Sequence, residues 1–232
     1  MTHGLARLEA IGTGTRAAAV EAGAVSARVP APKLLRPPPG EDFWVFGYGS
    51  LMWHPGFPHL EVRPAHLYGY HRHFCVFSHL YRGTKKRPGL VLGLDRGGSC
   101  HGLAYRVPAA ESEEVVAYLR EREMVTEVYD PRWLHLRTRA GPVTAAAFVV
   151  DRGHKQYAGR LPLERVADMI AQGAGNRGSC LQYLENTVRH LEALGLSDPT
   201  LKRLLHLVRA RREGAGQTHL EWPQEVQRSQ PS

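Results

Sequence analysis

The chain has little cysteine: its three cysteines, among 232 residues, lie far apart and form no Cys-x-x-Cys pair. Disulfide frameworks and structural zinc sites need paired or closely spaced cysteines, so neither is expected, and a reducing, cytoplasmic location is favoured. Long apolar runs are also missing, since no stretch approaches the roughly 20 residues that a membrane-spanning helix requires. The sequence therefore predicts a soluble globular protein that has no membrane partner.

Nucleotide-binding fingerprints are absent as well. A dinucleotide motif built on Gly47 and Gly49 would need a third glycine where Met52 stands. A phosphate-binding loop would need Gly-Lys-Ser or Gly-Lys-Thr, which the chain does not contain. A Gly-x-Ser-x-Gly elbow is missing too, so Ser50 and Ser179 are not expected to act as nucleophiles.

Acidic residues are fewer than basic ones, which gives a formal net charge of +8. The 30 Lys and Arg are nevertheless spread along the chain, and the densest groups are Lys85-Lys86-Arg87 and residues 209–212. Neither group is interleaved with aromatic residues that would stack on bases, so no nucleic-acid partner is expected. A basic surface of this kind attracts small anionic substrates.

Large apolar residues are almost absent from residues 1–41, which are rich in Ala, Gly and Pro and are predicted to form a flexible tail. Their Arg and Ala content also fits a transit peptide, but Glu9, Glu21 and the lack of an amphipathic stripe disfavour it. Residues 42–212 are predicted to form one domain, and residues 213–232 a polar C-terminal tail.

Within that domain, short runs of apolar residues between glycine, proline and turn residues predict strands up to position 151, in one sheet or barrel. The last third is predicted to be helical over 162–172, from Ser179 to Gly195, and from Asp198 onward. Strands first and helices last indicate the α+β class. The predicted strands are Phe43–Tyr48, Leu67–Phe77, Leu90–Leu94, His101–Val107, Leu134–Thr138 and Val143–Asp151.

The segment Val45-Phe46-Gly47-Tyr48-Gly49-Ser50-Leu51-Met52-Trp53 joins an apolar strand to a turn with two glycines and a hydroxyl group. The glycines are expected to take positive φ and to let the backbone approach a ligand closely. Backbone N–H groups around Ser50 can then face a carboxylate. The segment therefore predicts a binding pocket.

A helix is predicted over residues 113–123, with Ser112 as its N-cap. At about 100° per residue, Glu123 projects among the apolar residues of this helix, whereas two other acids lie on the opposite face. The apolar stripe consists of Val115, Val116 and Leu119, and the opposite face carries Glu114 and Glu121.

A carboxylate held against apolar residues loses hydration, which raises its pKa and makes it a better base near neutral pH. Glu123 is therefore the best candidate for a general acid/base in the chain. The alternative is that the helix has ended by Met124, so that Glu123 merely pairs with Arg122 or another neighbour.

Six histidines lie between His54 and His79, and His71 and His73 would share one face of a strand. No carboxylate or cysteine stands at a ligand-like spacing from them, so no metal site is expected.

Four motifs along the chain, taken together and in order, resemble the ChaC-like γ-glutamylcyclotransferases over residues 43–210. A fifth stretch, residues 178–184, is similar to the family's Gly-x-Asn-x-x-Tyr-Leu, except that Cys180 stands at the Asn position, where it is expected to pack. The four motifs are the segment 45–53, Arg82-Gly83-Thr84 with Pro88-Gly89, Gly102-Leu103-Ala104-Tyr105-Arg106-Val107, and Arg122-Glu123-Met124-Val125-Thr126.

The resemblance implies a small mixed β-barrel with flanking helices. It also implies a reaction without metal or organic cofactor, in which the γ-glutamyl group of glutathione cyclises to 5-oxoproline and releases Cys-Gly. Glu123 would be the proton-transferring acid, Tyr183 would line the pocket, and Val45, Phe46, Gly47, Tyr48, Gly49, Ser50 and Leu51 would form the γ-glutamyl cradle. Arg82 is a further substrate-binding candidate, because a guanidinium binds a carboxylate as a fork, although a surface ion pair is the alternative.

The chemistry of such a reaction needs a base, because the α-amine of a γ-glutamyl group is protonated near neutral pH and must lose a proton before it attacks the γ-carbonyl carbon. Glu123 would take that proton and return it to the departing amide nitrogen. Backbone N–H groups of the turn at residues 47–50 are expected to stabilise the oxyanion, while Tyr48 and Ser50 are hydrogen-bonding candidates or structural residues. Two alternatives stay open: cyclotransfer on other γ-glutamyl amines or peptides, and a non-catalytic glutathione-binding regulatory protein.

Overall fold

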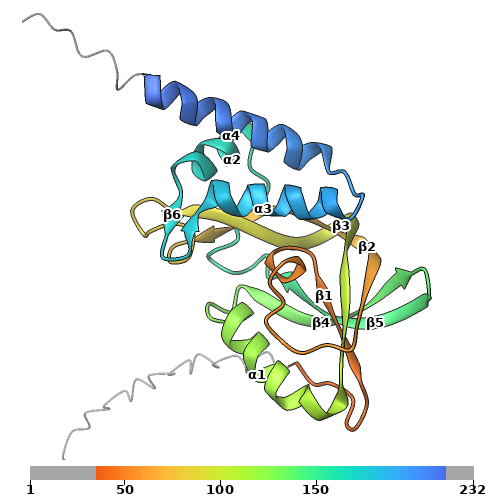
Figure 1. Ribbon diagram of the computed structural model, residues 1–232. Coiled ribbons are helices and arrows are strands. Elements are labelled where there is room, and N and C mark those ends of the chain that lie inside the picture. The colour runs from red at the N-terminus through yellow and green to blue at the C-terminus, as the bar shows by residue number, and fades with distance from the viewer. Residues whose placement is uncertain (1–34, 218–232) are drawn as a thin grey trace, which may run out of the picture. The chain divides into compact units, whose positions relative to one another are not determined.

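The computed structural model describes residues 35–217. The two predicted tails, residues 1–41 and 213–232, therefore lie largely outside the described residues. Within the described part, five strands close into a barrel in the order β1-β3-β2-β4-β5 (Figure 1). The strands are β1 (Phe43–Gly47), β2 (Glu61–Ser78), β3 (Gly89–Val107), β4 (Tyr129–Thr138) and β5 (Gly141–Val150).

Strands β2 and β3 are the longest and pair antiparallel along almost their whole length. The two short strands predicted at Leu90–Leu94 and His101–Val107 are one strand, β3. The turn residues between them do not end the strand, because Gly97 and Gly98 take positive φ at a shift in the pairing register. Such a bulge bends a strand without ending its pairing, so the sequence signal for a turn marks a bend in β3.

Strand β5 closes the barrel and makes it mixed. It pairs antiparallel with β4, and parallel with β1 at Ala145 and Ala146 and with β3 at Val149. Its last six residues, 145–150, are all buried, as expected for a mostly apolar strand that has neighbours on both sides.

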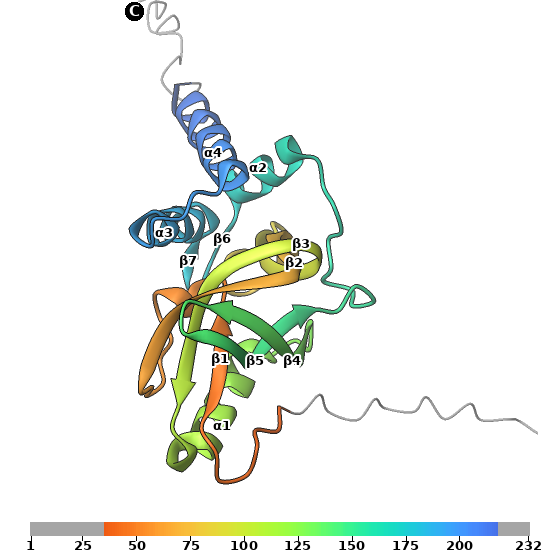
Figure 2. The ribbon, with the colours of Figure 1, turned by 90° about the vertical axis from the view of Figure 1, so that its right-hand side faces the viewer.

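Figures 1 and 2 show α2, α3 and α4 gathered on one side of the barrel, with α1 at the opposite end. A two-residue hairpin, β6 with β7, leads directly into α3. The helices are α1 (Ser112–Glu123), α2 (Leu163–Gln172), α3 (Cys180–Ala193) and α4 (Pro199–Gln217), and the shorter elements are η1 (Ser50–Met52), η2 (Ala109–Glu111), β6 (Ala174–Gly175) and β7 (Gly178–Ser179).

Side-chain caps stand at the start of two helices. Ser179 Oγ accepts a hydrogen bond of 3.1 Å from the N–H of Gln182 at the start of α3, and Asp198 Oδ1 accepts one of 3.0 Å at the start of α4. The prediction for Ser112 is wrong: this residue is already helical, because η2 runs straight into α1, and it belongs to the first turn.

The core extends slightly beyond the predicted domain. Leu35, within the range predicted as a tail, is 8% exposed and belongs to the buried apolar cluster. At the other end, α4 continues to Gln217 and so enters the range predicted as the C-terminal tail. No helix in residues 35–217 is both long and apolar enough to span a membrane.

Candidate active site

A cavity of about 670 Å³ lies where the turn after β1, the end of α1, the loop after β2 and the first turns of α3 meet. This volume is in the range of small-molecule binding sites in proteins. Its lining includes one carboxylate, three guanidinium groups and several tyrosines: Glu123, Arg82, Arg122, Arg177, Tyr48, Tyr118, Tyr129 and Tyr183.

Glu123 is the last residue of α1, and it lines this cavity together with Gly49 and Ser50. Leu119, one turn earlier, is fully buried, so the apolar face of the helix carries Glu123 towards the interior, where its side chain is 17% exposed. Burial raises the pKa of Glu123, while the neighbouring Arg122 opposes that rise by its charge and its hydrogen bond. The carboxyl group therefore lies in the cavity with its pKa shifted towards neutral pH.

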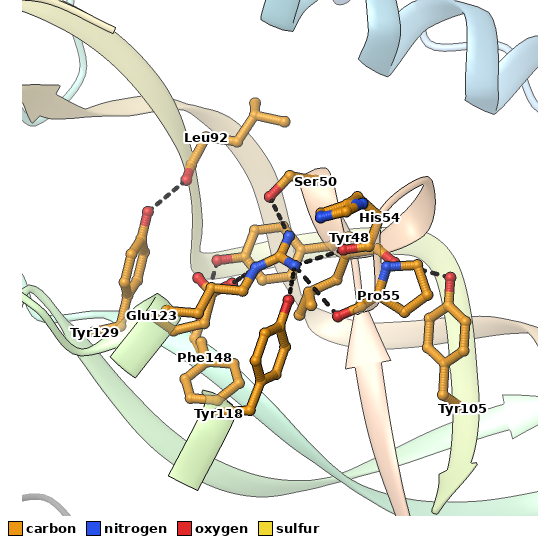
Figure 3. Close-up of polar contacts among 12 residues, drawn as sticks. Tyr48, Ser50, His54, Pro55, Leu92, Tyr105, Tyr118, Glu123, Tyr129 and Phe148 are labelled. Carbon is orange, nitrogen blue, oxygen red and sulfur yellow. Dashed lines mark hydrogen bonds and ion pairs between the residues drawn. The ribbon is translucent and has the colours of Figure 1, made fainter. Parts of the chain in front are cut away.

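Arg122 joins the end of α1 to the turn after β1. Its Nε donates to Glu123 Oε1 at 3.0 Å, its Nη2 to Ser50 Oγ at 3.0 Å and its Nη1 to Tyr118 Oη at 2.7 Å. The same Nη1 also donates to the backbone carbonyls of residues 54 and 55. Figure 3 shows these contacts as dashed lines between α1, which carries Tyr118 and Glu123, and the turn, which carries Ser50.

The helix end and the pairing with Arg122 that the alternative interpretation of Glu123 expected are both present. The helix ends at Glu123, and this residue does pair with Arg122, whose side chain is 10% exposed. The pairing does not take Glu123 out of the cavity, since both residues line it.

Buried tyrosines form the wall behind the carboxylate. Tyr48 Oη donates to the carbonyl of Phe148 at 2.9 Å, and Tyr129 Oη donates to the carbonyl of Leu92 at 2.8 Å (Figure 3). Burial raises the pKa of both phenols, and that of Tyr183, well above their usual value. These groups therefore stay neutral around Glu123.

Gly47 and Gly49 are needed for a different reason from the one predicted. Neither takes positive φ, and Gly49 has φ −133°. A Cβ on Gly47 would instead lie 3.1 Å from Leu51 Cβ, and one on Gly49 would lie 3.0 Å from Tyr183 Oη. The small size of both residues lets η1 and α3 pack closely against this turn.

The predicted cradle divides into two groups. Tyr48, Gly49, Ser50 and Leu51 line the cavity. Val45, Phe46 and Gly47 do not: Val45 and Phe46 are fully buried in the barrel, and all three pair with β3 residues. They hold the turn in place from beneath, and their side chains do not reach the cavity.

Arg82 and Tyr183 both line the cavity. Arg82 Nη1 donates to the carbonyl of Ser179 at 3.2 Å, and its guanidinium lies 5.4 Å from the centre of the Tyr183 ring. Burial lowers the pKa of Arg82, and the guanidinium forms no ion pair within residues 35–217. The surface ion pair considered as an alternative is thus not what the described residues show.

Cys180, the first residue of α3, packs beneath the Arg82 loop. Its Sγ donates to the carbonyl of Arg82 at 3.0 Å, and burial raises its pKa to about 11. A Cβ placed on Gly89 or Gly173 would lie 2.4 Å or 2.7 Å from this sulfur, so the surroundings leave little space for a larger side chain. These contacts agree with the packing role expected for Cys180.

The histidine pair of β2 lies away from this cavity. His71 and His73 share one face, with ring centres 4.8 Å apart, and His73 Nε2 lies 3.2 Å from the buried Asp95 carboxylate. Asp95 is also bound by Arg152 and Tyr157. Within the described residues, no group of three or more His, Cys, Asp or Glu is arranged to hold a metal ion.

The lining residues that were not predicted as site residues include Arg122, Tyr118 and Tyr129. The sequence contains a signal for two of them, since Arg122 adjoins Glu123 in its motif and Tyr118 stands four residues before Arg122 on the same helical face. Tyr129 has no such signal, because the closing of the barrel brings it into place.

Comparison with known proteins adds to this geometry. A family model described as ChaC-like protein matches residues 43–211, which is most of the chain. The chain belongs to the ChaC-like family. The ChaC-like chain is 39% identical over 163 residues to an Escherichia coli protein named glutathione-specific gamma-glutamylcyclotransferase, an alignment that covers 70% of this chain and 71% of the relative. A mouse protein named glutathione-specific gamma-glutamylcyclotransferase 1 is 34% identical over 175 residues, covering 72% of this chain and 78% of the relative.

The ChaC-like fold is also found among solved structures. A yeast gamma-glutamyl cyclotransferase specific to glutathione superposes with a TM-score of 0.70 at 21% identity, and the match covers 75% of this chain and 98% of the yeast chain. This likeness confirms the predicted α+β barrel with flanking helices.

Proposed function

We propose that this ChaC-like chain is a glutathione-specific γ-glutamylcyclotransferase, which converts glutathione to 5-oxoproline and Cys-Gly. The observation that carries the proposal is that the Glu123 carboxylate and the Gly49–Ser50 turn line one cavity. The names of the Escherichia coli and mouse relatives, at 39% and 34% identity, supply the substrate class.

In the proposed mechanism, Glu123 removes a proton from the α-ammonium group of the bound γ-glutamyl unit. The free amine attacks the γ-carbonyl carbon of the same unit, and the tetrahedral oxyanion is stabilised by backbone N–H groups at residues 49–51. Glu123 then gives the proton to the amide nitrogen of the cysteine, and the carbon–nitrogen bond breaks as the carbonyl re-forms. The second proton of the attacking nitrogen passes through Glu123 to the freed amine, so that 5-oxoproline and Cys-Gly leave and the carboxylate is regenerated. Burial of Glu123 favours this role because it raises the pKa of the carboxyl group.

The charges in the cavity fit a substrate that carries two carboxylates. Arg82 and Arg177 line the cavity, and neither forms an ion pair with another residue of the described range. Arg177 stands in the turn between β6 and β7, where its guanidinium lies 4.1 Å from the centre of the Tyr81 ring. Both guanidinium groups are therefore available to a carboxylate, which each can bind as a fork.

The test is a product assay. Purified protein is mixed with glutathione, and 5-oxoproline and Cys-Gly are quantified for the wild type, Glu123→Gln and Glu121→Gln. Glutamine keeps the shape of the side chain and loses the base, so we expect Glu123→Gln to lose activity by about 100-fold or more. Glu121 lies on the same helix but is exposed, so Glu121→Gln should behave as the wild type.

Other outcomes separate the alternatives. Turnover retained by Glu123→Gln contradicts the assigned role of that residue. Product from other γ-glutamyl amines at comparable rates shows a broader cyclotransferase. Thermal stabilisation of the wild type by glutathione without any product indicates a binding protein.

A further inference from the structure

Arg72 lies behind the turn that carries Gly49, on the side away from the active-site cavity. It belongs to β2, its side chain is 5% exposed, and it lines a second cavity of about 500 Å³ between the barrel and the helices α3 and α4. Its Nη1 donates a hydrogen bond of 2.7 Å to the carbonyl oxygen of Tyr48, and its Nη2 donates to the carbonyl of His101. Its Nε lies 4.0 Å from Asp198 Oδ2.

The bond to the Tyr48 carbonyl fixes the direction of the next N–H group. A trans peptide is planar, and its C=O and N–H bonds point in opposite directions. Since the Tyr48 carbonyl points towards Arg72, the N–H of Gly49 points away from Arg72. Gly49 lines the active-site cavity, and among residues 35–217 its N–H has no hydrogen-bond partner.

This peptide needs an anchor because it precedes a glycine. Glycine populates most of φ space at little cost, so the Tyr48–Gly49 peptide can rotate without a steric barrier from a side chain at Gly49. Rotation by half a turn would exchange the two groups and place a carbonyl oxygen where the donor had been. A charge-assisted hydrogen bond from a buried guanidinium favours one orientation strongly.

We propose that Arg72 is a positioning residue for the cyclisation: it holds the Tyr48–Gly49 peptide so that the Gly49 N–H faces the oxyanion of the tetrahedral intermediate. This role rests on the proposed function for its chemistry, and on the contacts of Arg72 for its geometry. Arg72 touches no substrate, and its effect passes through one backbone amide.

Steady-state kinetics with glutathione test the role. Arg72→Met keeps the aliphatic stem and removes every donor, so we expect kcat to fall by about 10- to 100-fold, less than the roughly 100- to 1,000-fold that follows deletion of an oxyanion donor, because the peptide still samples the right orientation. KM should change little. Arg72→Lys keeps the charge and a donor, and it should recover part of kcat.

Asp198→Asn is the matched control. It removes the charge that faces Arg72 Nε but keeps the oxygen that caps α4, so it weakens the contact with the helices and leaves the bond to Tyr48. We expect kcat of Asp198→Asn to stay near the wild-type value. An equal loss in both variants, or wild-type kcat in a folded Arg72→Met, would overturn the proposal.

A crystal structure of Arg72→Met gives a readout that does not depend on activity. We expect the Tyr48–Gly49 peptide to be rotated or to occupy two orientations, and a single unchanged orientation contradicts the proposal. Should the wild type release no 5-oxoproline, the proposed function fails by itself, and the orientation of this peptide still decides the role of Arg72. If Arg72→Met does not fold, Arg72→Lys carries both measurements.

Discussion

Removing the charge of Arg122 should move the acid limb of the pH profile to higher pH. Arg122 Nε lies 3.0 Å from Glu123 Oε1, and the two side chains are only 10% and 17% exposed. Opposite charges about 4 Å apart attract by about 4 kcal/mol at an effective dielectric constant near 20, before the cost of desolvation is subtracted. A neighbouring arginine typically lowers the pKa of a carboxyl group by about 1–3 units, so Arg122→Gln should raise the pKa of Glu123 by a similar amount.

The sign follows from the proposed role of Glu123 as a base. Only the carboxylate accepts a proton, so kcat/KM rises with pH through the pKa of Glu123 in the free enzyme and levels off above it. In Arg122→Gln the limb should therefore lie about 1–3 units higher, and below the limb activity should fall about tenfold per unit. The assay is 5-oxoproline formation at subsaturating glutathione from about pH 4 to about pH 9.

Two variants isolate the charge from the hydrogen bonds. Arg122→Lys keeps the charge but loses the several donors of the guanidinium group, so the acid limb of this variant should stay near the wild-type position. Tyr118→Phe removes one hydrogen-bond partner of Arg122 and no charge, so its limb should not move. The reasoning is refuted if the limb of a folded Arg122→Gln stays in place, or if Tyr118→Phe moves it as far.

Two further predictions concern packing around the site. Burial raises the pKa of the Cys75 thiol to about 12 and that of the Cys180 thiol to about 11. A thiol reagent should therefore label no cysteine in the native protein and all three after unfolding. Labelling of the native protein that abolishes activity would contradict this prediction. Gly49→Ala should lower kcat, because the added Cβ would lie 3.0 Å from Tyr183 Oη. Adding Tyr183→Phe should recover part of the loss, with a coupling free energy of about 0.5–3 kcal/mol in the double-mutant cycle. Strictly additive effects would show that this contact is not the cause of the loss. The three thiols are Cys75, Cys100 and Cys180.

Local patterns in the sequence were sufficient to predict part of the fold and the inward orientation of Glu123. The helical period places Glu123 after the buried Leu119, and the cap at Ser179 follows from side-chain chemistry within three residues. The continuity of β3 through Gly97 and Gly98 was missed, because a glycine bulge and a glycine turn have the same composition.

The contacts that shape the site could not be read from local patterns. Arg72 and the Tyr48 carbonyl are separated by 24 positions, and Arg122 and Ser50 by 72. Such pairs meet only after the barrel has closed and α1 has packed at its end, and no periodicity in the sequence encodes their register. The same holds for Gly49, where Tyr183 of α3, far along the chain, leaves no space for a larger side chain.

Arg72 and Arg122 bind the turn after β1 from opposite sides, each from its own cavity. The turn after β1 is irregular backbone, and irregular backbone leaves polar groups that neither strand nor helix satisfies. Arg72 binds the Tyr48 carbonyl from behind the turn, while Arg122 binds Ser50 Oγ and the carbonyls of residues 54 and 55 from the active-site side. Because Arg122 also binds Glu123, in the proposed mechanism its guanidinium sets the distance between the base and the turn, and that of Arg72 sets the direction of the amide at Gly49. A reaction within one bound molecule depends on both quantities, since its rate follows from how closely amine, base and oxyanion donor are held.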